Sequence, residues 1–394
     1  MTCEEKYFEL YGRAPDAVTF CPYRTCFLGA HIDHQAGSIN ANAIDMGIHI
    51  AYSRKESGIC EINSLNFPKR VQFHVNEIPD EKPDDWGDHL RGAVKQLGEK
   101  YPLRYGISAV ISGDFPVGGL SSSAAVIIAF MTAIADVNKI QLDPWSTIMM
   151  AKAAENKYVG VNCGKLDQCA EVLSKKDQLL YLDCQDDSYK LIPWTGKPFV
   201  IGVFFSGLER SLANSAYNLR QDECKAAAYD LLALAGLPYG KFSEAVLRDV
   251  PRPVFDEYMD RLPIPFRKRA EHFFTEFERA QKGVDLWQKG DLEGYGQLVF
   301  ESGASSINNY ESGCPELITM YNIMRETDGI YGGRFSGAGF KGSSVAIIDP
   351  EKAEDVLHTI EEKYLKAYPA LEGKYIGRIC HSADGVDLSG GVRR

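Results

Sequence analysis

Basic residues are scarce in this sequence. Lys and Arg number 43 against 54 Asp and Glu, so the formal net charge of the 394-residue chain is −11 at pH 7. A surface that binds nucleic acid needs a face rich in positive charge. The composition therefore argues against a nucleic-acid partner, although a local basic pocket for an anionic substrate remains compatible with it.

Long apolar runs and paired cysteines are also missing. The apolar stretches are too short and too interrupted to cross a bilayer. The first residues, MTCEEKYFEL, have neither the basic nor the apolar region of a signal peptide. None of the ten cysteines falls in a Cys-x-x-Cys pair, which argues against a zinc knuckle or a redox motif. We expect a cytoplasmic protein with reduced thiols and no membrane partner; its oligomeric state is left unknown.

The chain contains no internal repeat and no low-complexity tract. Hydrophobic residues make up 45% of it, which is typical of a globular protein with a sizeable core, and its length suits two domains. Pro193, Gly196 and Pro198 cluster where a connection between domains is expected. We therefore predict an N-terminal domain over residues 1–195 and a C-terminal domain over residues 196–394.

Periodicity indicates an α+β protein, because strand-like and helix-like stretches alternate without a strict βαβ order. β-Branched runs predict strands, and apolar residues at helical spacing predict helices. The expected strands are Ile44–Ser53, Ile59–Asn63, Arg70–Val75, Ile107–Ser112, Phe199–Phe205, Ser344–Asp349 and Tyr375–Cys380. The expected helices are Ser121–Val137, Asp143–Tyr158, Ala213–Leu234, Arg267–Gln288, Pro315–Arg325 and Glu351–Tyr364.

A stretch rich in glycine and serine, PVGGLSSSAA at residues 116–125, joins an expected strand to an expected helix. Glycine lets the backbone curl tightly around a ligand. The N-terminus of a helix offers free N–H groups and a dipole that favours an anion. The stretch therefore predicts a phosphate cradle with a serine hydroxyl available to ligate magnesium. An ordinary helix cap before a buried helix is the alternative interpretation.

The same stretch resembles the ATP-binding motif of the GHMP kinase superfamily. The resemblance implies ATP and Mg²⁺ as cofactors, and a two-domain GHMP kinase fold with the active site in the cleft between the domains. It assigns nucleotide binding to the loop and magnesium binding to one of two serines in it. The loop residues are Gly118, Gly119, Leu120, Ser121, Ser122, Ser123 and Ala124, and the candidate magnesium ligands are Ser122 and Ser123.

A second stretch, YVGVNCGKLDQ at residues 158–168, resembles the galactokinase segment that ends in Cys-Gly-x-x-Asp-Gln. The resemblance makes Asp167 the catalytic aspartate and Gly164 a backbone contact to the sugar. Glu155 matches a glutamate that is proposed to hold magnesium in the family. From the residues alone, an aspartate after a glycine turn is more often a cap or a solvated side chain.

Residues 22–34, PYRTCFLGAHIDH, nearly spell the galactokinase sugar signature. The resemblance places Arg24 beside Asp167, where a cation keeps the carboxylate ionised and stabilises charge on the transferred phosphoryl group. It also makes Asp33 and His31 parts of the sugar site.

Two later features extend the resemblance. Tyr217 resembles a family tyrosine that lines the sugar site, with a buried structural tyrosine as the alternative. The stretch GGRFSGAGFKG at residues 332–342 contains Gly-x-Gly-x-x-Gly, a pattern that can bind dinucleotides. It precedes an expected strand instead of opening a helix after one, and it resembles the third glycine-rich motif of the GHMP kinases. No Gly-x4-Gly-Lys-Ser/Thr loop is present, which argues against a Walker-type ATPase.

The sugar signature breaks at Ala30, where galactokinases keep a glutamate that faces the sixth carbon of the sugar. Opposite a uronate, that glutamate would repel the substrate carboxylate by about 4 kcal/mol at ~4 Å and an effective dielectric of ~20. This energy corresponds to a roughly thousandfold weaker binding affinity. Ala30 removes the repulsion, and Tyr23 and His34 also fit the pattern of plant-type galacturonokinases. Alternatively, Ala30 is a small packing residue. Tyr23, Thr25 and Lys165 are candidate partners for the carboxylate.

The predicted function is a kinase that transfers the γ-phosphate of ATP to the anomeric hydroxyl of D-galacturonate. Asp167 would orient or deprotonate that hydroxyl, while Arg24 would steady the aspartate and the moving phosphoryl group. The alternatives are a galactokinase, a glucuronokinase or a non-catalytic sugar sensor of the galactokinase type. The presence of every catalytic part disfavours the sensor, and the galactokinase-type first motif disfavours a superfamily decarboxylase.

Overall fold

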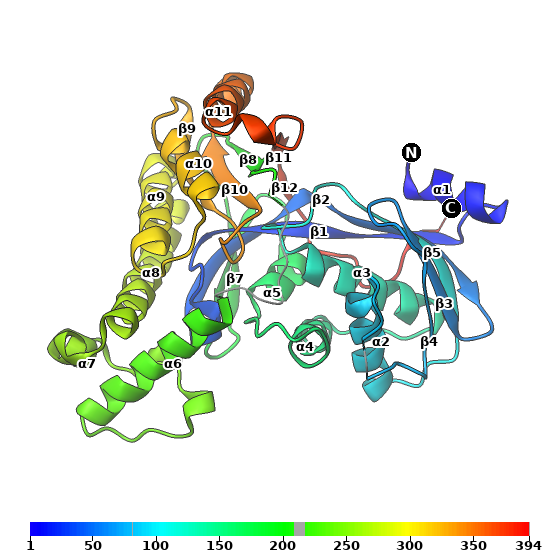
Figure 1. Cartoon of the computed structure of the whole chain (residues 1–394), viewed down its shortest axis with the longest axis horizontal. Coiled ribbons are helices and arrows are strands. Elements are labelled where there is room, and N and C mark those ends of the chain that lie inside the picture. The colour runs from blue at the N-terminus through cyan, green and yellow to red at the C-terminus, as the bar shows by residue number, and fades with distance from the viewer. Residues whose placement is uncertain (81, 209–216, 394) are drawn as a thin grey trace.

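The chain folds around two β-sheets of unequal size, as shown by a computed structural model that describes residues 1–80, 82–208 and 217–393. The larger sheet is built mainly from the first half of the chain, and the smaller sheet is built from the second half (Figure 1). Helices cover both sheets, and one long helix of the second half, Leu292–Asn308, contacts strands of both.

Two long antiparallel strands, β1 (Ala17–Leu28) and β2 (Ser38–Lys55), form the spine of the larger sheet. The turn that joins them contains the end of the sugar signature and a short 3-10 helix, Asp33–Gln35. The strand order is β13-β1-β2-β5-β3-β4, and β6 and β12 also pair with β2. The other strands are β3 (Ile59–Ser64), β4 (Val71–His74), β5 (Gly106–Gly113), β6 (Gln178–Asp183), β7 (Tyr189–Pro193), β12 (Ser382–Ala383) and β13 (Val392–Arg393).

Helices α3 and α5 pack against β1 and β2, α2 and α4 pack against α3, and α1 lies on the other face of the sheet (Figure 1). The central helix, α3, is apolar around most of its circumference, so it is buried among its neighbours. The end of α4 continues as a π-helical turn, Ala154–Val159, a distortion that often marks functional sites. The helices are α1 (Cys3–Tyr11), α2 (Asp88–Lys100), α3 (Ser122–Val137), α4 (Pro144–Ala153) and α5 (Leu166–Leu173).

The smaller sheet is antiparallel, with the order β11-β8-β10-β9. Helices α10 and α11 pack on it, while α9 packs on β9 and α8 contacts β1 and β2. Helices α6 and α7 extend from this half as an arm with its own small core (Figure 1). The strands are β8 (Val200–Phe205), β9 (Ile330–Phe335), β10 (Ser343–Ile348) and β11 (Ile376–Cys380). The helices are α6 (Tyr217–Leu234), α7 (Arg252–Tyr258), α8 (Ile264–Gln288), α9 (Leu292–Asn308), α10 (Pro315–Arg325) and α11 (Ala353–Ala367).

The predicted α+β class is confirmed, and each expected strand and helix has a counterpart within a few residues. The expected helix over residues 213–234 begins with four residues, 213–216, that lie outside the described part of the chain. The predicted boundary at 195/196 falls between β7 and β8. However, the last strands, β12 and β13, pair with β2 and β1, so the end of the chain returns to the larger sheet.

Candidate active site

A cavity of about 730 Å³ lies between the two halves of the fold. Its walls include the turn after β1, the connection from β5 to α3, the segment before α5 and the turn after β9. These four segments contain the sequence motifs. All the predicted site residues line the cavity except Leu120 and Ala124, which are buried beneath the glycine-serine loop.

An ion pair between Arg24 on β1 and Asp167 in the first turn of α5 lies at the centre of the cavity wall. The Arg24 Nη2 lies 2.7 Å from Asp167 Oδ1, and Nε donates to the same oxygen at 2.8 Å. The Arg24 side chain is buried, whereas that of Asp167 stays 26% exposed. Arg24 Nη1 also donates to Gly119 O at 3.1 Å and to Ser336 Oγ at 3.3 Å. Arg24 therefore connects the aspartate to both glycine-rich loops.

The two glycine-rich loops pack backbone against backbone. The Ser343 hydroxyl donates to Gly118 O at 2.8 Å. A Cβ at Gly342 would lie 2.7 Å from the carbonyl carbon of Gly118, and a Cβ at Gly119 would lie 2.8 Å from Ser343 N. Gly118 and Gly119 also have φ values of 140° and 90°, which disfavour other residues. Glycine at these positions lets the second half of the chain close against the phosphate cradle.

The start of α3 offers hydrogen-bond donors to the cavity. Ser121 precedes the helix with φ of 61°, and no side chain of the described residues caps the helix N-terminus. The first N–H groups of α3 are therefore available to a ligand. Within the same described part of the chain, the buried hydroxyl of Ser121 has no hydrogen-bond partner. An anion in the cradle would satisfy these groups, so this end of the cavity fits phosphate.

Glu155 lies in the π-helical turn and lines the same end of the cavity. Burial, followed by the negative charge of Asp167, raises the pKa of Glu155 to about 7, while Ser123, Cys163 and Gln168 oppose the rise through hydrogen bonds. The described residues contain no cluster of three acidic, histidine or cysteine ligands. One carboxylate beside serine hydroxyls nevertheless suits Mg²⁺, which is often held by one or two carboxylates together with substrate phosphates. The residues therefore fit this ion.

At the other end of the cavity, Asp33 faces the segment before α5. Its Oδ2 accepts a hydrogen bond from Leu166 N at 3.2 Å. A Cβ at Gly164 would lie 2.0 Å from that oxygen, so a side chain at this position would displace the aspartate. Burial and then the charge of Asp167 raise the pKa of Asp33. Asp33 and Asp167 thus line the part of the cavity that is predicted to hold the sugar.

His31, Tyr217 and Ala30 also line the cavity. His31 has φ of 62°, and its ring stacks on Tyr310 with 4.2 Å between the centroids. Burial, followed by the charge of Asp33, raises the pKa of Tyr217 far above its usual range. Ala30 is buried and leaves its part of the wall without a side-chain acid. The structure therefore brings together the residues that the sugar signature predicts.

The three candidate partners for a substrate carboxylate are oriented differently. Tyr23 lines the cavity, but its ring packs in the main core and its hydroxyl lies on the glycine-loop side. The Thr25 hydroxyl donates to a backbone carbonyl of β2 at 3.5 Å, and Lys165 forms an ion pair with Asp187. Neither Thr25 nor Lys165 lines the cavity.

Sequence reasoning missed several residues of this site. Ser336 contacts Arg24, and Arg334 contributes a buried guanidinium to the cavity wall. Phe67 and Trp86 line the cavity with stacked rings whose centroids are 5.8 Å apart, a surface suited to a planar base. The glycine-rich motif around Arg334 and Ser336 gave a signal, and Trp86 opens the stretch WGDHLRGA, which resembles a galactokinase segment near the nucleotide. In the part of the chain that the structure describes, no helix has the length and apolarity to cross a bilayer.

Known family models match three segments of the chain. The model of the GHMP kinases N terminal domain matches residues 88–175, and the GHMP kinases C terminal model matches residues 283–366. The galactokinase galactose-binding signature matches residues 5–54. These segments contribute the phosphate cradle, part of the smaller sheet and the turn after β1. Fold and site together define a kinase of the GHMP class, whose members use ATP.

Individual relatives narrow this class. The chain is 38% identical over 393 residues to galacturonokinase from Arabidopsis thaliana, covering 93% of this chain and 92% of the relative. It is 30% identical over 383 residues to galactokinase from Roseiflexus sp. (strain RS-1), covering 97% of this chain and 95% of that relative. The crystal structure of Lactococcus lactis galactokinase complexed with galactose shares the fold, with a TM-score of 0.88, 24% identity and 98% of both chains covered. The chain belongs to the GHMP kinase superfamily, in its galactokinase branch.

Proposed function

We propose that the protein is a sugar 1-kinase that transfers the γ-phosphate of ATP to the anomeric hydroxyl of D-galacturonate. The products are galacturonate 1-phosphate and ADP. The observation that carries this proposal is Ala30, which lines the cavity and has no acid at the position where the galactokinase signature keeps a glutamate. The similarity to a plant protein named galacturonokinase supports the same substrate.

The central ion pair performs the transfer. Asp167 accepts a hydrogen bond from the anomeric hydroxyl, orients its oxygen and takes up its proton as the new bond to the γ-phosphorus forms. The bond between that phosphorus and the bridging oxygen breaks, and ADP leaves with the electron pair. Arg24 lies between Asp167 and the glycine loops, so its charge stabilises both the carboxylate and the phosphoryl oxygens.

The cofactors are held by the start of α3 and the π-helical turn. Backbone N–H groups at Ser122 and Ser123 bind the phosphates, and the stacked rings of Phe67 and Trp86 bind the base. Glu155 and a serine hydroxyl hold Mg²⁺, which neutralises phosphate charge when it is bound. The resemblance that suggests Glu155 is supported by its burial beside this loop.

Asp33 fixes the sugar by accepting hydrogen bonds from ring hydroxyls. Its position against Gly164 and Leu166 holds the carboxylate still, which favours a productive geometry. With the anomeric hydroxyl at Asp167, the exocyclic end of the sugar faces Ala30. A carboxylate at that end meets no repulsion there, whereas an acidic side chain would exclude it.

A coupled kinase assay with ATP and Mg²⁺ tests the proposal on D-galacturonate, D-glucuronate and D-galactose. We expect the highest kcat/KM for galacturonate, with the phosphate attached to the anomeric carbon by phosphorus NMR. A large preference for galactose would refute the substrate, and failure to turn over any sugar in the presence of ATP would leave the non-catalytic sensor as the better account.

Substitution at Ala30 sharpens the test. Ala30→Glu adds a negative charge, and Ala30→Gln adds nearly the same volume without one. We expect Ala30→Glu to lower kcat/KM for galacturonate by roughly a thousandfold, and to lower that for galactose far less. Equal losses for both sugars in both variants would mean that Ala30 is only a packing residue.

A further inference from the structure

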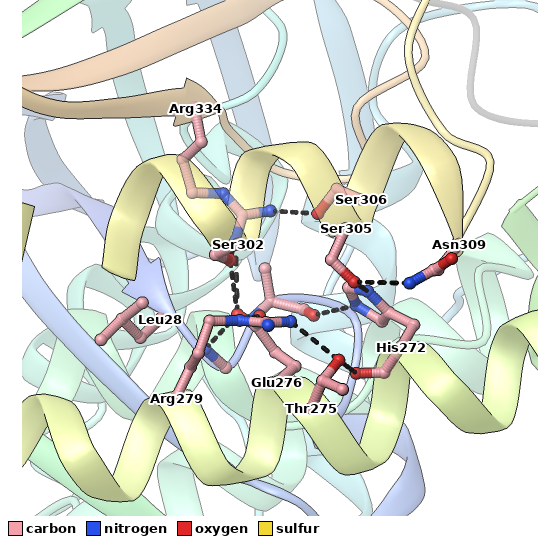
Figure 2. A network of polar contacts seen from close by, with 12 residues as sticks. Leu28, His272, Thr275, Glu276, Arg279, Ser302, Ser305, Ser306, Asn309 and Arg334 are labelled. Carbon is pink, nitrogen blue, oxygen red and sulfur yellow. Dashed lines mark hydrogen bonds and ion pairs between the residues drawn. The ribbon is translucent and has the colours of Figure 1, made fainter. Parts of the chain in front are cut away.

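A second charged centre lies behind the turn after β1, separate from Arg24 and Asp167. Glu276 on α8 is fully buried, with Arg279 Nε 2.9 Å and Arg334 Nη1 3.6 Å from its carboxylate oxygens. Figure 2 shows these side chains and those of α9 converging on the chain near Leu28. We name Glu276, Arg279 and Arg334 the Glu276 cluster.

Helix α8 fixes the backbone of Ala30 from both sides. Glu276 Oε1 accepts hydrogen bonds from Gly29 N at 2.7 Å and from Ala30 N at 3.3 Å. One turn earlier, His272 Nε2 lies 3.0 Å from Ala30 O, and its Nδ1 lies 3.0 Å from Ser305 Oγ. Burial lowers the pKa of His272 to about 4. The ring is therefore neutral at pH 7, donating from Nε2 and accepting at Nδ1.

The Glu276 cluster contains two guanidinium groups and one carboxylate. Burial opposes ionisation of Glu276, but Arg279 and Arg334 outweigh it and lower the pKa of the carboxyl group to about 2. Among the described residues, no other carboxylate lies within ion-pair distance of either arginine. Since His272 is neutral, the cluster has one positive charge in excess at pH 7.

That excess charge adjoins the cavity. Arg334 is 1% exposed, lines the cavity wall and is held by the hydroxyls of Ser302 and Ser306 (Figure 2). A charge in a water-poor interior acts more strongly on a nearby ligand than a solvated one. Ala30 adjoins the Glu276 cluster, because its backbone N–H binds Glu276, and it lines the same cavity as Arg334.

We propose that the Glu276 cluster selects an acidic sugar, with Arg334 supplying the positive charge that attracts a carboxylate at the end of the substrate facing Ala30. This inference rests on the proposed function, because it assumes that the exocyclic end faces Ala30. Arg334 is the specificity residue, Arg279 contributes the second positive charge, and Glu276 is a positioning residue that holds the Ala30 backbone. A neutral hexose gains nothing from the excess charge.

Charge removal at Arg334 tests the inference. Titration calorimetry without ATP gives the affinity for galacturonate and for galactose, and steady-state assays give KM and kcat. We expect Arg334→Met to weaken galacturonate binding roughly tenfold. The KM for galacturonate should rise by a larger factor than kcat falls, and the affinity for galactose should fall less. Arg334→Lys keeps the charge, so it should recover most of the galacturonate affinity.

A second variant keeps the test independent of folding at the buried position. Arg279 is partly exposed, and Arg279→Met makes the cluster neutral while leaving Arg334 in the wall. Arg279→Met should weaken the binding of galacturonate more than that of galactose, and by a smaller factor than Arg334→Met does. Arg267→Met is the matched control, since Arg267 lies on the same helix and pairs with the exposed Asp260; it should change neither affinity.

Two outcomes separate this inference from the proposed function. A wild-type enzyme that fails to phosphorylate galacturonate defeats the proposed function. The second outcome concerns the ratio of the affinities for galacturonate and galactose. If this ratio is the same in the wild type, Arg334→Met and Arg279→Met, the role of the Glu276 cluster is overturned, even if galacturonate is the substrate.

Discussion

Two arginine–carboxylate centres lie close to the turn after β1, and they differ in exposure and in charge balance. Arg24 and Asp167 form a one-to-one pair whose carboxylate remains 26% exposed to the cavity. The Glu276 cluster places two arginines around a carboxylate that is fully buried. The first centre can therefore exchange a hydrogen bond or a proton with a substrate, whereas the second can act only through position and charge.

The buried centre is tolerable because its polar groups are satisfied. An ionised carboxylate in the interior is costly unless charges and hydrogen bonds compensate it. Glu276 receives two arginines, the N–H groups of Gly29 and Ala30, and the Ser302 hydroxyl at 2.6 Å. Asp167 needs fewer partners because its side chain stays 26% exposed. Variants that neutralise each carboxylate should therefore have different consequences.

Neutralising the exposed carboxylate should give the largest loss of activity. Asp167→Asn keeps the shape but cannot take up a proton, so we expect kcat to fall by about a thousandfold or more. Thermal unfolding should show that the variant still folds. Asp260→Asn removes an exposed acid paired with Arg267 and serves as the control. A variant that retains a tenth of the wild-type kcat would contradict the role of Asp167.

Neutralising the buried carboxylate should instead damage stability. Glu276→Gln leaves two arginines without their acid, and we expect the free energy of unfolding to fall by about 3–5 kcal/mol. Asp328→Asn removes an exposed ion pair with Lys352 and should cost less than about 1 kcal/mol. Urea unfolding monitored by fluorescence measures both. Equal losses in the two variants would show that burial does not distinguish the centres.

The contact between the glycine loops should matter to ATP more than to sugar. Gly342 has φ of 97°, and a Cβ there would lie 2.7 Å from Gly118. We expect Gly342→Ala to raise the KM for ATP about tenfold, because backbone strain and a displaced loop cost roughly 1–3 kcal/mol. Gly236→Ala, at φ of 65° with nothing within 4 Å, is the control. An unchanged KM for ATP in Gly342→Ala would separate this loop from the nucleotide.

The smallest expected effect is a pH dependence at Glu155. The pKa of this acid is raised to about 7 by burial and by Asp167, and only the ionised form can ligate Mg²⁺. As the pH falls through 7, the carboxylate takes up a proton, so the Mg²⁺ requirement should rise. Between pH 7.5 and 6.5 the ionised fraction falls roughly threefold. The half-saturating Mg²⁺ concentration, measured relative to Glu155→Gln, should rise by that factor; parallel profiles for both proteins would exclude Glu155 as a ligand.

Much of the fold could be predicted because local pattern and tertiary structure agree. The apolar run after the serines predicts α3 to within one residue, and Asp143 followed by Pro144 marks the start of α4. Helix α9 was not expected, since its sequence contains three glycines. Tertiary contact explains it: a Cβ at Gly296 would lie 2.2 Å from Tyr331 O, so the glycine lets α9 pack directly on β9.

The candidate site likewise has parts that the sequence could predict and parts that it could not. The glycine and serine motifs are local, and the pair of Arg24 and Asp167 followed from family resemblance. The Glu276 cluster could not be predicted, because Glu276 reaches the Ala30 backbone across 246 positions of the chain and α8 reads as an ordinary amphipathic helix. Strand β1 was also missed, since Pro22 interrupts its pattern at a shift of the strand register.

A structure of the protein crystallised with D-galacturonate and a non-hydrolysable ATP analogue tests the central claim most directly. The measured quantity is the position of the substrate carboxylate relative to Ala30 and Arg334. The account predicts that the anomeric hydroxyl lies at Asp167 and that the carboxylate lies against Ala30 on the side of Arg334. A carboxylate that points away from both residues, or toward solvent, would contradict it.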